Sequence, residues 1–252
     1  IVGAGGVIAT SEDGVTWLQQ DTGTTSNLNG YAVIPNLLSP NPAASGIPGS
    51  LTAVIAVGDN GTVLSSINGI GWTSQSSGVT ANLKSIAWSD DGIFAIGEGG
   101  LILKSLDRVT WTPCVTPVTV DLHGIAYNPT DNSFTVVGDN GVILRSVNGG
   151  TTWLNLGAFA DGTLTSVAYG GGRYVAVGPD GWVAGSADGV VWTRQAGPAL
   201  NSITYGNGRF VAVGGKDTEL EQFVELKPVH SIAEPSVYTI TFVNQTNATV
   251  QN

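Results

Sequence analysis

The sequence predicts an all-β protein assembled from a repeated four-stranded unit, and three observations support this prediction. An apolar strand, a tight turn, a second apolar strand and a polar turn ending in Trp recur through the chain, most clearly between Phe134 and Trp153. Successive copies place their tryptophans 39, 42 and 39 residues apart, near the ~40–45 residues of a four-stranded repeat. Glycine is abundant, only 11% of residues are charged, and no segment has helical periodicity.

Each element of the unit follows from its residues. The apolar runs from Phe134 to Gly138 and from Val142 to Leu144 are separated by Gly-Asp-Asn-Gly, which is a strong hairpin signal. The next stretch, from Ser146 to Thr152, is rich in Ser, Asn and Gly, and Trp153 begins a further strand. The sequence therefore predicts three consecutive antiparallel strands in this copy.

A fourth strand precedes each unit and begins at a leucine. The segments that predict it are 83–88, 122–127, 164–169, 200–205 and, more weakly, 28–33. The complete unit therefore has four short strands, which is the blade of a β-propeller.

The polar turn resembles the Asp-box of BNR-type propellers, whose pattern is Ser-x-Asp-x-Gly-x-Thr-Trp. Its other copies run from Ser11 to Trp17, Ser66 to Trp72, Ser105 to Trp111 and Ser186 to Trp192, each one residue shorter than the family pattern. The resemblance covers residues 1–215 and implies a structural, non-catalytic turn between the outer strands of a blade. It does not define a function, because Asp-boxes occur in sialidases, other glycosidases, photosystem assembly factors, sorting receptors and phage virion proteins.

The ends of the repeat region predict a closed ring of five blades. Ile1 to Gly3 align with the end of a second strand, and 201–205 and 209–213 match a first and second strand with no third strand after them. We expect the termini to share one blade by pairing, which would also hide open sheet edges; residues upstream of Ile1 would raise the blade count. This predicts a propeller over residues 1–215.

Two segments fall outside the repeat. Residues 216–252 predict a strand-rich extension that packs on the ring, pairs with another subunit or begins a further domain. In this extension, Tyr238, Ile240 and Phe242 share one strand face. Residues 35–50 predict a surface insertion rich in proline.

Composition excludes several functions. The formal charge of −10 and the scattered basic residues argue against a nucleic acid or an anionic membrane as partner. No apolar stretch is long enough to span a bilayer. Cys114 has no partner for an internal disulfide. No metal site or cofactor is expected, because His123 and His230 are far apart and lack ligands at suitable spacing.

Two sets of repeat-related residues form the candidate binding site. The hairpins between second and third strands carry Asp59, Glu98, Asp139 and Asp180. The second residues of the first strands are Asn29, Lys84, His123, Thr165 and Asn201. Both sets should lie at the same end of the central channel of the propeller. Polar residues that vary between repeats at this end are typical of a ligand-binding site. The alternative interpretation needs no ligand: the acidic residues are ones that tight turns prefer, and the varied polar residues are ones that solvent exposure permits. Trp182 departs from the repeat and is a candidate exposed aromatic.

These features predict a non-catalytic function. A sialidase would need converging arginines, whereas the five arginines here occupy repeat-related positions. The repeat sequences resemble those of propellers in bacteriophage virion and tail proteins. This resemblance implies a structural or attachment component of a virion. Its partners would be other subunits, contacted through the C-terminal extension, and a cell-surface glycan or receptor. The alternative is a secreted, lectin-like propeller that binds carbohydrate.

Overall fold

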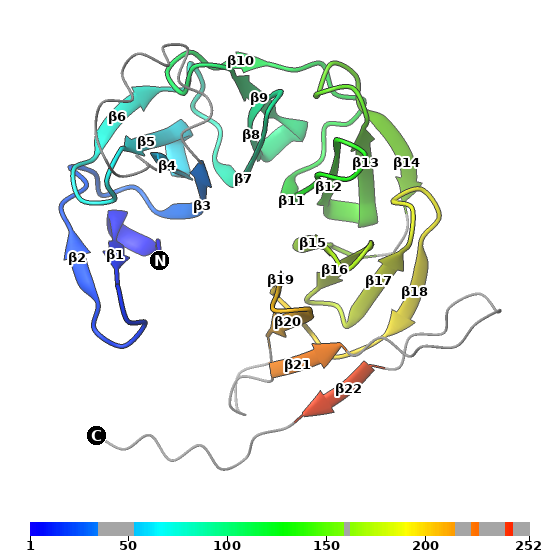
Figure 1. Cartoon of the computed structure of the whole chain (residues 1–252). Helices are drawn as coiled ribbons and strands as arrows, with labels where there is room; N and C mark the ends of the chain where they lie inside the picture. Colours follow the sequence, from blue (N-terminus) through cyan, green and yellow to red (C-terminus); the bar gives the residue numbers. More distant parts are fainter. Residues whose placement is uncertain (35–52, 159–161, 215–222, 227–239, 244–252) are drawn as a thin grey trace. The chain divides into compact units, whose positions relative to one another are not determined.

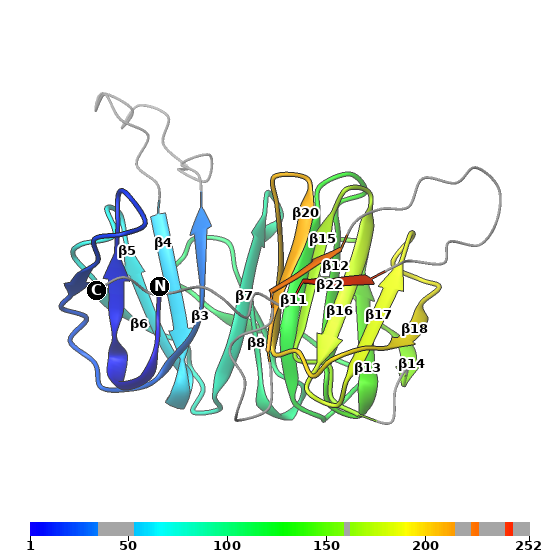
Figure 2. The same ribbon diagram turned by 90° about the horizontal axis from the view of Figure 1, so that it is seen from below.

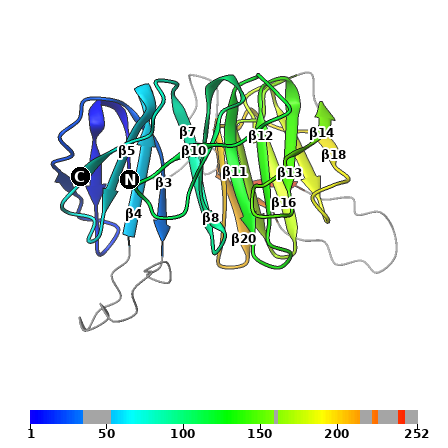
Figure 3. The same cartoon turned by 90° about the horizontal axis from the view of Figure 1, so that it is seen from above.

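The computed structural model describes residues 1–34, 53–158, 162–214, 223–226 and 240–243, and its regular elements are strands joined by short turns (Figure 1). The described residues form five four-stranded sheets and one two-stranded sheet. Neighbouring strands run antiparallel, as the side views of Figures 2 and 3 show. Within the described ranges, no helix is long and apolar enough to cross a bilayer.

The strands follow the repeat in sequence order. The two-stranded sheet contains β1 (Ile8–Thr10) and β2 (Leu18–Gln20). The next two sheets contain β3 (Leu28–Ile34), β4 (Ala53–Gly58), β5 (Thr62–Ser66) and β6 (Thr73–Ser76), then β7 (Leu83–Ser89), β8 (Gly92–Gly97), β9 (Ile102–Ser105) and β10 (Thr112–Pro113). The fourth sheet contains β11 (Leu122–Asn128), β12 (Ser133–Gly138), β13 (Val142–Ser146) and β14 (Leu154–Ala158). The fifth contains β15 (Ser166–Gly170), β16 (Arg173–Gly178), β17 (Trp182–Ser186) and β18 (Thr193–Ala196). The sixth contains β19 (Ser202–Gly206), β20 (Arg209–Val213), β21 (Phe223–Leu226) and β22 (Ile240–Val243). Five blades fit this arrangement.

Contacts divide the chain into two compact units. Unit 1 comprises Ile1–His123, Pro129–Phe134 and Ser146–Leu154, and unit 2 comprises Gly124–Asn128, Thr135–Arg145 and Asn155–Asn252. In unit 1, Ile55 of β4 and Ile93 of β8 belong to one fully buried cluster. In unit 2, a second cluster joins Val177 of β16 to Phe210 of β20. Apolar faces of consecutive sheets therefore pack on each other.

The predicted hairpins at Asp59, Glu98 and Asp139, and the corresponding one at Ala4, are tight 3-10 turns, whereas the hairpin at Asp180 is an ordinary turn. The 3-10 turns are η1 (Ala4–Gly6), η4 (Asp59–Gly61), η5 (Glu98–Gly100) and η6 (Asp139–Gly141). The last residue of η5, Gly100, has φ +76, and a Cβ there would clash with the main-chain carbonyl of Val118. Glycine is therefore required at this position both for its backbone conformation and for its lack of a side chain.

The predicted polar turns, which we call the Ser-x-Asp turns, close on themselves through side-chain oxygens. In the first copy, the Asp13 carboxylate accepts hydrogen bonds from the main-chain N–H groups of Val15 (2.8 Å) and Thr16 (2.7 Å). The Ser11 hydroxyl accepts one from Gly14 N–H at 2.8 Å. These hydrogen bonds explain why Ser and Asp or Asn recur at this spacing.

The predicted closure of the ring by pairing of terminal strands was wrong. The second edge of β20 is already occupied by β21, with Phe210 opposite Leu226. The other edge of β1 instead meets the chain's own start, through a Val2–Ile8 bridge and the Ile1 amino group, which donates to Ala9 O at 2.8 Å. The missing third strand of the last repeat is therefore β21.

Other predictions fall partly on residues without a described structure. The 35–50 insertion and Tyr238 lie outside the described residues. The predicted strand-rich character of the extension is confirmed by β21 and β22, while its role in contacting another subunit stays a prediction.

Candidate functional site

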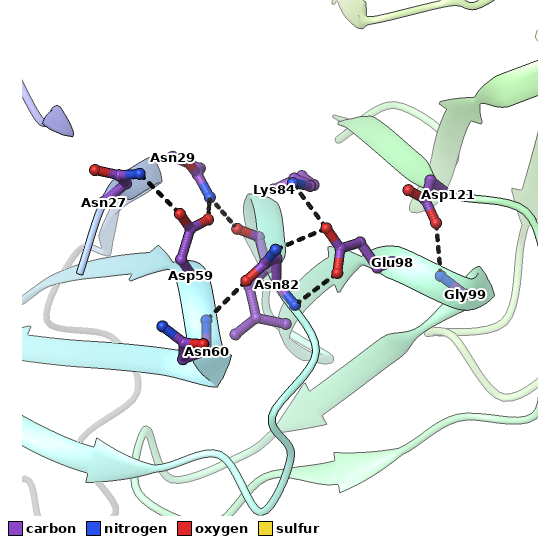
Figure 4. A network of polar contacts seen from close by, with 10 residues as sticks. Asn27, Asn29, Asp59, Asn60, Asn82, Lys84, Glu98, Gly99 and Asp121 are labelled. Atoms are coloured by element: carbon purple, nitrogen blue, oxygen red, sulfur yellow. Dashed lines mark hydrogen bonds and ion pairs between the residues drawn. The ribbon is translucent and has the colours of Figure 1, made fainter.

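Two of the acidic hairpin residues, Asp59 and Glu98, are hydrogen-bonded within their own sheets. Asn27 Nδ2 donates to Asp59 Oδ2 at 2.9 Å, and Asn82 Nδ2 donates to Glu98 Oε1 at 2.7 Å (Figure 4). Asn27 and Asn82 each stand immediately before the leucine that opens a first strand. We call this position the clasp residue.

The clasp residue also reaches the preceding sheet. Its side-chain oxygen accepts a hydrogen bond from a main-chain N–H of the hairpin one sheet earlier. The three bonds are Gly5 N to Asn27 Oδ1 at 3.0 Å, Asn60 N to Asn82 Oδ1 at 2.8 Å and Gly99 N to Asp121 Oδ1 at 2.9 Å. Because the donor is main chain, this contact is independent of the hairpin side chain.

Unit 2 contains a variant of the same arrangement. Its clasp residue is Thr163, whose hydroxyl donates to Asp139 Oδ1 of the preceding sheet at 3.0 Å. The Thr163 main-chain N–H donates to Asp180 Oδ2 of its own sheet, also at 3.0 Å. All four acidic hairpin residues therefore act as hydrogen-bond acceptors in joints between or within sheets.

The second predicted set takes part in the same network. Asn29 and Lys84 sit at β-bulges, where the register of the first strand shifts by one residue. Asn29 Nδ2 donates both to Asp59 Oδ1 at 2.9 Å and to Leu83 O of the next sheet at 2.8 Å. Lys84 Nζ forms an ion pair with Glu98 Oε1 at 3.1 Å.

The remaining members of this set are positioned by the first strands of later sheets. Thr165 Oγ1 donates to Asn201 O at 2.9 Å, which joins two consecutive sheets. Asn201 itself is exposed, and its main-chain N–H donates to Val213 O. His123 is the second residue of β11 and is half-buried. The structure thus assigns a stabilising contact to most of the predicted site residues.

The electrostatics of Glu98 favour the ionised form. The Asn82 side-chain amide, followed by the Lys84 ammonium, lowers the pKa of the Glu98 carboxyl from its usual value of 4.5. A general acid at neutral pH needs a raised pKa, so Glu98 is suited to a structural ion pair. Across the described ranges, no group of three His, Cys, Asp or Glu residues could hold a metal ion.

Trp182 is partly exposed and lies in a stacked pair. The Arg194 guanidinium carbon is 3.8 Å from the centroid of its ring. The two side chains come from the adjacent strands β17 and β18.

A groove of about 860 Å³ lies in unit 1 beside the predicted residue Glu98. Its walls are β6, the connection from β6 to β7, and the hairpin η5. The lining residues are Asn60, Gly61, Thr62, Ser74, Gln75, Ser76, Ser77, Gly78, Val79, Thr80, Ala81, Glu98, Gly99, Gly100, Leu101, Cys114 and Thr116. Most are small or polar, and burial raises the pKa of the Cys114 thiol.

The groove has a counterpart one repeat earlier. A hollow of about 490 Å³ is lined by Gly5, Gly6 and 19–25. These positions correspond to Asn60, Gly61 and 74–80 at the 55-residue spacing of Trp17 and Trp72. The groove is therefore a product of the repeat, and no sequence motif marks it because its walls are backbone and small side chains.

Comparison with known proteins identifies the fold. No family model and no curated protein sequence matched the chain. Among solved structures, YCF48 bound to D1 peptide is 15% identical (TM-score 0.63), with 89% of this chain and 72% of that chain covered. A chain of the nidogen–laminin complex is 12% identical (TM-score 0.62), with 89% of this chain and 87% of that chain covered. The WD40 β-propeller domain of Doa1 is 10% identical (TM-score 0.63), with 89% of this chain and 73% of that chain covered.

With its repeated four-stranded antiparallel sheets, the chain has the fold of a β-propeller. At these identities the similarity establishes the fold alone, and YCF48 and WD40 propellers are among its structural neighbours.

Proposed function

We propose that this chain is a non-catalytic β-propeller that binds an extended peptide segment of a protein partner in the groove beside β6. One observation carries the proposal: the groove follows a free strand edge. In the strand order β3-β4-β5-β6, β6 is last, and within the described ranges no strand pairs with its outer edge. Ser74, Gln75 and Ser76 belong to this edge strand and also line the groove.

The chemistry of the groove suits a peptide backbone. An edge strand presents unpaired main-chain N–H and C=O groups, which an added strand can satisfy. Exposed hydroxyls of Ser74, Ser76 and Thr80 offer further hydrogen bonds, and the partly buried Val79 and Leu101 offer apolar contact. The volume falls within the ~300–1,000 Å³ that is usual for ligand sites.

The structural neighbours support binding of proteins. One is described with a bound peptide and another in a complex of two proteins. The repeated Ser-x-Asp turns support assignment to the Asp-box propellers. Within this class, we propose a structural or attachment component of a larger particle such as a virion, with the C-terminal extension contacting other subunits. A secreted carbohydrate-binding propeller is the alternative, and the partly exposed Trp182 supports it.

Selection from a random peptide display library tests the peptide site. Enriched peptides are synthesised, and their Kd for the full chain is measured by fluorescence polarisation. Ser74→Trp fills the groove and should weaken binding at least tenfold. Thr73→Trp is the matched control, because Thr73 is also exposed on β6 but does not line the groove.

Three outcomes separate the possibilities. Loss of peptide binding in S74W, with binding retained in T73W, supports the groove as the peptide-binding site. Equal binding to both variants contradicts it and places the peptide elsewhere. Failure to enrich any peptide, with a positive result on a glycan array, favours the carbohydrate alternative.

A further inference from the structure

Trp182 and Arg194 form a stacked pair on unit 2. Trp182 opens β17 and is partly exposed, while Arg194 is the second residue of β18 and is exposed. The guanidinium carbon lies 3.8 Å from the ring centroid, which is close packing of the cation on the aromatic face. The stack holds a long, flexible side chain in one place.

The stack leaves the hydrogen-bond donors of Arg194 unused. A guanidinium has five N–H donors around its edge, and stacking uses only its face. Among the described residues, the Arg194 guanidinium makes neither an ion pair nor a hydrogen bond. Arg145 differs, because it lies over Tyr174 and also donates to the Asp188 main-chain carbonyl.

The pair occupies the repeat position that forms the groove in unit 1. Trp182 corresponds to Thr62, and Arg194, two residues after Trp192, corresponds to Ser74, two residues after Trp72. Thr62 and Ser74 both line the groove. Where unit 1 has small side chains beside an edge strand, unit 2 therefore has an aromatic and a cation.

The sheet edge at this position is also free. β18 is last in the order β15-β16-β17-β18, and no described strand pairs with its outer edge. An extended segment added to β18 would run past Arg194. Trp and Arg are the side chains most enriched at the energetic centres of protein interfaces.

We propose that the β18 edge binds an extended peptide segment carrying a single carboxylate side chain, which Arg194 receives through two parallel N–H···O bonds. The planar fork of the guanidinium matches a carboxylate. The net charge of −10 disfavours a segment with several acidic residues. A single carboxylate beside Arg194 is attracted by the guanidinium, and it is repelled less by the net negative charge of the chain than several carboxylates would be. This site is separate from the β6 groove and does not depend on it.

The test uses the isotope-labelled full chain and two blocked peptides, Val-Thr-Glu-Val-Thr-Val and the same sequence with Gln in place of Glu. Side-chain N–H resonances of Arg194 and Trp182, assigned with Arg194→Lys and Trp182→Phe variants, report binding by NMR titration. The Glu peptide should shift both resonances and bind at least about tenfold more tightly than the Gln peptide.

Matched variants separate specific recognition from general charge effects. Arg194→Gln should abolish the preference for Glu, and Arg194→Lys should lose most of it, because Lys lacks the fork. Arg108→Gln removes the same charge from a Ser-x-Asp turn in unit 1 and should leave the affinity unchanged. Equal affinity for the two peptides, no binding at millimolar concentration, or equal loss in R194Q and R108Q would overturn the proposal.

Discussion

Asn82 is the residue whose replacement tests the clasp most directly. Asn82→Ala removes two side-chain hydrogen bonds, one from Asn60 N–H at 2.8 Å and one to the Glu98 carboxylate at 2.7 Å. A neutral hydrogen bond contributes about 1 kcal/mol net, and one to a charged group about 1.5–3 kcal/mol. Water replaces part of this contribution, because Asn60 is exposed and the Glu98 side chain is 35% exposed.

The expected loss is therefore about 2 kcal/mol in the free energy of unfolding. For a chain of this length, that corresponds to a fall in Tm of roughly 4–8 °C. Urea denaturation followed by circular dichroism measures the free energy, and calorimetry measures the Tm. Asn201→Ala is the control, since Asn201 is exposed and its main-chain N–H, not its side chain, forms the inter-strand bond.

A loss within about 0.5 kcal/mol of the control would show that the two Asn82 hydrogen bonds do not stabilise the fold, because exposed substitutions away from special contacts usually fall in that range. A double-mutant cycle with Glu98→Ala gives an independent measure. Two residues in one hydrogen-bond network should show a coupling energy of about 0.5–3 kcal/mol. Additive effects would mean that the bond between them contributes nothing.

Three further predictions follow from single residues. Gly100→Ala should destabilise more than Gly99→Ala in denaturation experiments: both have positive φ (+76 and +67), but only the Cβ at Gly100 meets Val118 O. Main-chain N–H groups, that of Thr110 first, lower the pKa of Asp107 from 3.8 to about 2. Because the folded pKa is depressed, this stabilisation is present above pH 3.8 and lost as the pH falls toward 2, and Asp107→Asn should remove that part of the pH dependence of unfolding. Burial raises the pKa of Cys114 from 9.0, so its reaction with a thiol reagent should be slow at pH 8, and a peptide bound in the groove should slow it further.

The regular parts of the fold were predictable because each depends on neighbours in sequence. The hairpin at Asp139 follows from the Gly-Asp-Asn-Gly signal, with Asn140 and Gly141 at positive φ. The Ser-x-Asp turns follow from side-chain oxygens that reach N–H groups two or three residues away. Local spacing of this kind is fully visible in the sequence.

The contacts between sheets were not predictable in the same way. Asn82 lies 22 residues from Asn60 and 16 from Glu98, and only the packing of two sheets brings the three together. The structure shows the acidic hairpin residues as hydrogen-bond acceptors in these joints, and their binding of a ligand stays a prediction. Trp182 was predicted to be exposed, but its stacking with Arg194 depends on the pairing of β17 with β18.

The choice of partner for β20 shows a second limit. The repeat motif predicted no third strand after Val213, because the hairpin residues of the other copies are absent there. β21 nevertheless pairs with β20, since backbone pairing requires only an extended segment within reach. The spacing of the motifs predicts where strands begin, but it does not predict which strand pairs with the free edge of β20.

The clasp has a consequence for how such a chain can grow. The β3 and β7 sheets each carry two complementary halves of one joint: a clasp side chain that accepts from the hairpin before it and a hairpin amide that donates to the clasp residue of the next sheet. Gly5, Asn60 and Gly99 all serve as donors through the main chain. Tandem duplication of a gene segment encoding one unit would thus supply both halves at once. The number of such sheets can change in evolution while these main-chain joints keep their geometry, and the side chains of their hairpins can diverge independently.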